Sequence, residues 1–213
     1  MHLTNRSKQL LKILGLAILG STSLSSPVLA DSHAFITANR SSTANTIYFQ
    51  EGIDSEFGHY RLSHDDGTVS TEAWLGTNLS TSIGTEVWKF IQLEAGYGAI
   101  NLHKSSDKLD RLSGSRLHSG LRLDFTAPLF NLELGGGFQA STLDYANHEE
   151  TATFYGTGTY VSLGMNYFLT THLSVYSEVK YTTEHMKNTG GSGSIDAIGT
   201  NSTEGGLGFR IWF

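Results

Sequence analysis

Apolar and polar residues alternate through most of this chain, from residue 68 to the last residue. A period of two places successive side chains on opposite faces of an extended strand, so the pattern predicts strands with one apolar and one polar face. Beyond residue 31, no segment carries apolar residues at helical spacing over three turns, and none carries 18 consecutive apolar residues. The expected fold class is therefore all-β, without a transmembrane helix.

The alternation divides into about eight segments of roughly 9–13 residues, close to the length that crosses a bilayer as a tilted strand. The clearest segments are 68–80, 90–101, 115–127, 131–145, 154–168, 173–181 and 203–213. Short connections are expected at about 126–131 and 168–172, and long polar ones near 103–114, 146–152 and 185–202. Tight turns at one end and longer loops at the other are typical of outer-membrane barrels.

The start of the barrel lies somewhere within 31–66. Three short stretches there could be the first strand, and they are Ala34–Ala38, Thr46–Gln50 and His59–Leu62. Ile47 and Phe49 give the second stretch an apolar face. We favour the region 45–52.

Residues 1–30 have the plan of a secretory signal peptide. Arg6, Lys8 and Lys12 make a basic region at the start of a short apolar stretch over 10–19, and Val28 and Ala30 occupy the small-residue positions of a cleavage site before Asp31. The run is shorter than the roughly 20 residues of a spanning helix. We expect cleavage between Ala30 and Asp31, which leaves 31–213 as one domain.

Charge and motifs argue against several functions. Beyond Ala30 there are 11 basic and 20 acidic residues, and an acidic protein repels nucleic acid. Without cysteine, the chain has neither disulfides nor a lipoprotein anchor. The metalloprotease, nucleophile-elbow and phosphate-loop motifs are missing, so we expect no metal and no cofactor. The one adjacent His/Ser pair, His118 and Ser119, would point to opposite faces of a strand, which argues against an enzyme.

The last strand has an apolar face that ends on an aromatic residue. That face comprises Leu207, Phe209, Ile211 and Phe213. The opposite face carries Glu204, Arg210 and Trp212. Two environments fit this strand: the core of a soluble sheet, or lipid around the closing strand of a barrel.

Charged residues recur opposite the apolar positions of the other strands too. In a soluble sandwich these charges would face water, whereas in a barrel they would fill the lumen and pair there. Eight strands enclose a space that side chains just fill, which predicts a plug rather than a wide pore. The expected lumen charge network consists of Glu72, Glu94, Arg122, Asp124, Glu133, Glu178, Lys180, Glu204 and Arg210.

Aromatic residues are the second feature that fits a barrel, because amphipathic rings are stable at the level of lipid head groups. Simple strand propensity would also explain them. The expected girdle residues are Tyr48, Tyr97, Tyr145, Tyr155, Tyr167, Tyr181 and Trp212.

On these features the chain resembles the small OmpA/OmpX-type outer-membrane β-barrels: a leader, sorted loops, the strands across 68–213 and the terminal alternation at 207–213. The resemblance implies an up-and-down transmembrane barrel in a Gram-negative outer membrane. It also implies that the barrel-assembly machinery recognises Leu207, Phe209, Ile211 and Phe213. The function expected is a structural or surface-interaction role through the extracellular loops. The main alternative is a soluble exported β-sandwich that binds a ligand, and the minor ones are a lipid-modifying hydrolase and a narrow porin.

Overall fold

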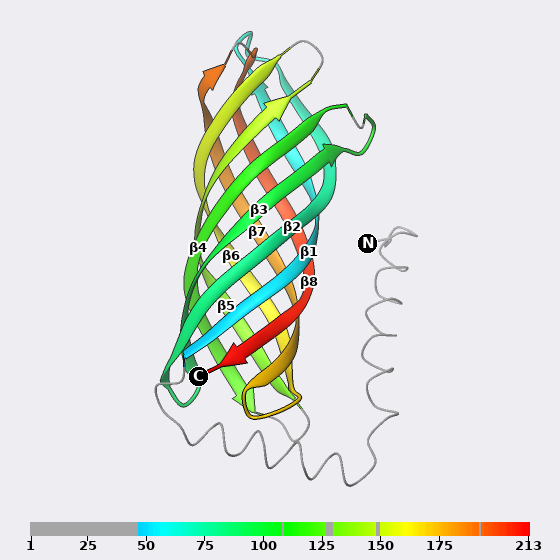
Figure 1. Ribbon diagram of the computed structural model, residues 1–213. Coiled ribbons are helices and arrows are strands. Elements are labelled where there is room, and N and C mark those ends of the chain that lie inside the picture. The colour runs from blue at the N-terminus through cyan, green and yellow to red at the C-terminus, as the bar shows by residue number, and fades with distance from the viewer. Residues whose placement is uncertain (1–46, 108, 127–129, 148–149, 192) are drawn as a thin grey trace, which may run out of the picture.

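The structure, a computed structural model, describes residues 47–213 except 108, 127–129, 148–149 and 192. Each strand pairs antiparallel with its neighbours in sequence, and the first strand pairs with the last, which closes the sheet into a barrel (Figure 1). A closed ring has no sheet edges, so the expected all-β barrel is confirmed and the sandwich is wrong. The strands are β1 (Ile47–His64), β2 (Val69–Trp88), β3 (Ile91–Lys104), β4 (Arg111–Thr126), β5 (Asn131–Ala146), β6 (Thr151–Phe168), β7 (Leu173–Gly191) and β8 (Ile195–Trp212). In this part of the chain, no helix is long and apolar enough to cross a membrane.

The first strand is longer than the sequence indicated. β1 contains most of the favoured region 45–52 and also the alternative stretch His59–Leu62, because both belong to one continuous strand. The third candidate, Ala34–Ala38, lies outside the described residues, as do the signal peptide and the cleavage site between Ala30 and Asp31.

The expected difference in loop length is wrong. Residues 185–202 form most of a hairpin, in which β7 continues to Gly191 and β8 begins at Ile195. Met186 pairs with Ile198 in this hairpin, so its Gly-, Ser- and Thr-rich sequence is held by a ladder rather than left as a loop. The connections at one end, 65–68, 105–110, 147–150 and 192–194, are hardly longer than those at the other, 89–90, 127–130 and 169–172.

We call the end where β1 begins and β8 finishes the terminal end, and the opposite end the distal end (Figure 1). Around the terminal half, every strand exposes large apolar side chains on the outside of the barrel. This apolar belt consists of Phe49, Ile53, Phe57, Leu75, Leu79, Ile83, Leu93, Tyr97, Leu117, Leu121, Phe125, Leu132, Leu134, Phe138, Val161, Leu163, Tyr167, Val179, Tyr181, Leu207, Phe209 and Ile211. A continuous ring of this kind is the surface that a barrel presents to lipid.

In the distal half the polarity is reversed. Its inside is a hydrophobic core, and the residues that share this core are Tyr60, Leu62, Trp74, Ile100, Leu102, Leu112, Leu143, Tyr145, Ala152, Phe154, Met186, Ile195 and Ile198. Its outside carries exposed polar residues, among them Arg61, Asn101, Ser113, Asp144 and Lys187.

Strand length accounts for this reversal. The strands have 14 to 20 residues. A tilted strand of about 18 residues spans roughly 45 Å along the barrel axis, whereas the lipid-facing band of such barrels is about 25 Å tall. The apolar belt is therefore shorter than the strands, and the distal part beyond it follows the soluble rule of apolar inside and polar outside.

The expected aromatic girdle is partly wrong. Tyr48, Tyr145 and Trp212 point into the barrel and are buried, because they occupy inward positions of the alternation. The rings of Tyr48 and Trp212 pack together near the terminal mouth with their centroids 4.9 Å apart. The outward and half-exposed rings are those of Tyr97, Tyr155, Tyr167 and Tyr181.

Candidate functional site: a charged lumen

The inside of the terminal half is filled by ion pairs centred on three arginines. The first, Arg116 of β4, contacts three glutamates from three other strands. Its guanidinium lies 2.5 Å from Glu204, 2.9 Å from Glu184 and 3.3 Å from Glu56. All four side chains are almost completely buried, so the positive charge is compensated by acids rather than by water.

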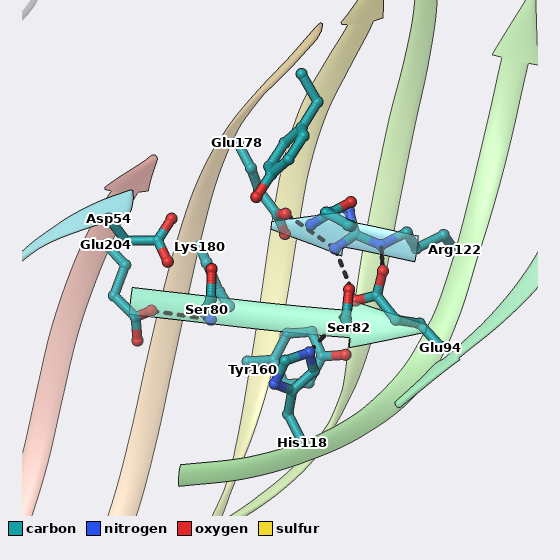
Figure 2. A pocket seen from close by; sticks show the side chains of 12 residues that line it. Asp54, Ser80, Ser82, Glu94, His118, Arg122, Tyr160, Glu178, Lys180 and Glu204 are labelled. Atoms are coloured by element: carbon teal, nitrogen blue, oxygen red, sulfur yellow. Dashed lines mark hydrogen bonds and ion pairs between the residues drawn. The ribbon is translucent and has the colours of Figure 1, made fainter. Parts of the chain in front are cut away.

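The second centre, Arg122, lies six residues further along the same inward face of β4. Its guanidinium donates to Glu94 at 2.8 and 2.9 Å and to Glu178 at 2.9 Å, as Figure 2 shows. A longer bond of 3.3 Å reaches Glu133 of β5. Charge-assisted bonds of this kind are stronger than neutral ones, and they fix the side chains of four strands relative to one another.

The third centre, Arg210 of β8, links the lumen to the terminal mouth. It binds Glu133 through both terminal nitrogens, with one bond at 3.0 Å, and donates to Gln50 at 2.6 and 2.9 Å. Its guanidinium carbon also lies 4.4 Å from the centre of the Tyr48 ring. Since Glu133 accepts from both Arg122 and Arg210, these two centres form one network.

Tyrosine rings fill the space between the ion pairs. The side chain of Tyr176 lies directly over Gly52 and Gly208, and the hydroxyl of Tyr160 lies over Gly120. A Cβ atom at any of these glycines would overlap with the tyrosine. Glycine is therefore required here by close approach, and the lumen is packed like a protein interior.

Two small cavities lie in the lumen among the described residues. One cavity of about 20 Å³ lies among Asp54, Ser80, Ser82 and Glu178 (Figure 2). A second, of about 10 Å³, lies near the terminal mouth beside Asp124 and Asn131. Each is the size of roughly one water molecule.

The structure places the predicted lumen residues in three settings. Glu94, Arg122, Glu133, Glu178, Glu204 and Arg210 belong to the arginine centres, and Lys180 joins them through Glu204 at 2.9 Å. Asp124 also points inward, but it accepts from the amides of Gln92 and Asn131 instead of a cation. Glu72 lies in the distal half, where it pairs with Lys104 at 2.7 Å.

Sequence reasoning missed three members of the network. Glu56 lies within 31–66, between two of the stretches considered for the first strand. Glu184 follows the segment 173–181, which was predicted as a strand. Arg116 shares the inward parity of His118 and Arg122, so extending that alternation by one step would have found it. The four terminal residues Leu207, Phe209, Ile211 and Phe213 all point outward and are exposed.

The His/Ser pair is divided between the two sides of the barrel wall. His118 points into the lumen, where its Nε2 lies 3.4 Å from Glu94 and its ring meets Tyr160 edge-on. Ser119 is on the outside. In the described part of the chain, no group of three or more His, Cys, Asp or Glu is arranged to hold a metal ion.

Comparison with known proteins yields likenesses of structure alone. No protein-family model matches the sequence, and no curated protein matches it either. The barrel is similar to Neisserial surface protein A, with a TM-score of 0.54 and 14% identity over 78% of this chain and 97% of that one. It is equally similar to the outer membrane protein OprG from Pseudomonas aeruginosa, with a TM-score of 0.54 and 13% identity over 82% and 98%.

The outer membrane protease OmpT from Escherichia coli also superposes, at 12% identity over 81% of this chain and 100% of that one. Its TM-score of 0.43 is too low to bear on activity. Identities this low show the fold and nothing finer. The chain has the up-and-down fold of the small barrels of Gram-negative outer membranes, which confirms the fold that its resemblance to OmpA/OmpX-type barrels implied.

Proposed function

We propose that this protein is an integral outer-membrane barrel with a plugged lumen, and that its distal part serves a structural or surface-interaction role. The reversal of polarity carries this proposal. An apolar belt surrounds the charged half, while the other half has a polar outside and its own hydrophobic core. A barrel built in this way stands in lipid at one end and holds the other end rigidly in water.

The proposed orientation places the terminal end in the periplasm and the distal end outside the cell. The exposed apolar face of Leu207, Phe209, Ile211 and Phe213 would then be available to the assembly machinery while the barrel is still open. The distal connections are short, so the interacting surface would include the walls of the projecting barrel as well as its loops.

Membrane insertion is tested by extraction and by electrophoresis. We expect the protein to remain in membranes washed with urea or carbonate, and to migrate differently in SDS with and without boiling. Release by these washes, together with identical migration, would contradict insertion.

Orientation is tested with single cysteines, which the cysteine-free chain makes simple. A membrane-impermeant maleimide should label Asp66→Cys in the distal β1–β2 connection of intact cells. Lys89→Cys, in the terminal β2–β3 connection, should react only after the outer membrane is opened. The reverse result would show that the barrel is inserted the other way round.

The plug is supported by the arginine centres and by the small volume of the lumenal cavities. In planar bilayers we expect no steady ion conductance from the wild-type protein. The narrow-porin alternative predicts discrete open channels, with a preference for cations because inward carboxylates outnumber inward cations.

A lipid-modifying activity would need a serine and a base within hydrogen-bond reach, and the barrel wall separates His118 from Ser119. We therefore expect Ser119→Ala to leave the lipid composition of the outer membrane unchanged by mass spectrometry. A changed composition would favour the hydrolase.

A further inference from the structure

Four basic side chains stand together on the outside of the distal half. His59 and Arg61 come from β1, and His185 and Lys187 come from β7. All four are exposed, and β8 runs between the two pairs. We call this group the basic patch.

The register makes the basic patch a shallow cradle. Gly199 of β8 pairs with Arg61 on one side and with His185 on the other. Neighbouring strands are about 4.8 Å apart, so these two side chains rise from the sheet roughly 10 Å from each other. A Cβ atom at Gly199 would meet nothing within 4 Å, so the floor between them is open. A gap of this width admits a phosphate group.

The other two basic side chains lie diagonally across Gly199 from each other. Lys187 lies opposite Ala197, and His59 lies opposite Asn201. The side-chain oxygen of Asn201 accepts from Tyr181 at 3.4 Å and from Thr183 at 3.1 Å. Because the oxygen is used, the amide of Asn201 offers hydrogen-bond donors to a ligand.

The charges of Arg61 and Lys187 in the basic patch have no paired acid within the described part of the barrel. Among the described residues, none of the four basic side chains forms an ion pair. Two acids are exposed on these three strands: Asp196 on β8, beside Ala197, and Glu51, at the terminal end of β1. By contrast, Lys104 at the distal end of β3 has Glu72 and Asp110 as partners.

The basic patch lies at the edge of the apolar belt. Toward the terminal end, the belt begins two residues from His59, at Phe57, and four residues from His185, at Tyr181. A step of two to four residues along a tilted strand is roughly 5–10 Å, the depth at which the head groups lie beside acyl chains.

We propose that the basic patch binds the phosphate group of an anionic membrane lipid in the leaflet at the distal end. The lipid is favoured over a free anion because its acyl chains would lie against Phe57 and Tyr181 while its phosphate occupies the cradle over Gly199. This inference rests on the proposed membrane insertion, but not on the proposed interaction role.

The test is a lipid titration of the detergent-solubilised protein, with bound lipids counted by native mass spectrometry. The probe is phosphatidic acid, and phosphatidylcholine is the zwitterionic reference. A basic residue near an anionic lipid surface contributes about fivefold in affinity, from roughly 1 kcal/mol per charge. We expect Arg61→Ala to weaken the first phosphatidic acid about fivefold and Arg61→Ala with Lys187→Ala roughly 30-fold. Heat-modifiable migration checks that each variant is folded.

The matched control is Arg111→Ala. Arg111 is also an exposed arginine at a distal outward position, but on β4. We expect less than about a twofold effect there, the size of a general charge effect. Equal losses for Arg61→Ala and Arg111→Ala, or equal binding of the two lipids, would overturn the proposal.

A separate arm adds an excess of inorganic phosphate. Retention of phosphatidic acid supports a lipid site, whereas complete displacement would show a site for free anions and contradict the proposal. Cell fractionation tests the outer-membrane location independently, so failure of the proposed function would be seen there and not in this titration.

Discussion

Replacing Arg116 by alanine should show how much the stability of the barrel depends on the cations in its lumen. The substitution leaves three buried glutamates without the guanidinium that now lies 2.5 to 3.3 Å from them. Breaking a buried ion pair by removing one partner costs about 3–5 kcal/mol, because an uncompensated charge remains. Lys180 still contacts Glu204, so the cost falls mainly on Glu56 and Glu184. We expect the free energy of unfolding to drop by about 3–5 kcal/mol.

The assay is equilibrium urea unfolding in lipid vesicles, followed by tryptophan fluorescence. Lys104→Ala is the control, since its partly exposed pair with Glu72 should be worth less, about 1 kcal/mol. Arg116→Met combined with Glu56→Gln and Glu184→Gln removes the unpaired charges together with the arginine, so it should recover most of the lost stability. A loss below about 1 kcal/mol for Arg116→Ala, or an equal loss for the triple variant, would refute the reasoning.

Three further predictions concern packing, assembly and pH. Gly120→Ala should destabilise the barrel by about 1–3 kcal/mol, because its Cβ would overlap with the tyrosine hydroxyl above it, whereas Gly205→Ala, with open space around it, should change urea stability by less than about 0.5 kcal/mol. Deletion of Phe213 should leave unassembled protein in the periplasm, and normal membrane levels of this variant in fractionated cells would count against the terminal signature. Hydrogen bonds from the side chain and the backbone N–H of Thr68 hold the pKa of Asp66 below its ordinary value. This turn should therefore be ordered above about pH 4, the ordinary pKa, and loosen as pH falls through the lowered pKa, with faster amide exchange at Thr68 by NMR; a turn unchanged at low pH would be the opposite result.

The alternation was enough to predict the strands of the terminal half. There the apolar face forms the exposed belt and the charged face lines the lumen, so the sequence period and the two sides of the barrel wall agree along each strand. The parity also placed Arg210 and Glu204 on the inward side, where the structure has them.

The distal half could not be read in the same way, because the polarity changes sides within a strand. On β1, Phe57 points outward while Tyr60 and Leu62 point inward. A phase change of this kind interrupts the amphipathic pattern, and the Gly-, Ser- and Thr-rich composition of 185–202 predicted a loop there. Backbone pairing of Met186 with Ile198, and not a single amphipathic face, continues the strands there.

The sequence also could not predict which acid each arginine pairs with in the lumen. Glu56, Arg116 and Glu204 are separated by 60 and 88 residues along the chain, and they meet because the barrel closes β1 onto β8. The two-residue alternation predicts that a charged side chain points inward, but the register and tilt of the strands decide which acid each arginine contacts.

The reversal of polarity along the barrel is tested most directly by spin labels on single cysteines of β8. We expect a label at Leu207 to be accessible to oxygen dissolved in the bilayer and protected from a water-soluble nickel reagent. A label at Asn201, two outward positions beyond Gly205, should show the opposite accessibility. Nickel access at Leu207, or bilayer oxygen access at Asn201 equal to that at Leu207, would contradict a barrel that is lipid-facing at its terminal half and water-facing at its distal half.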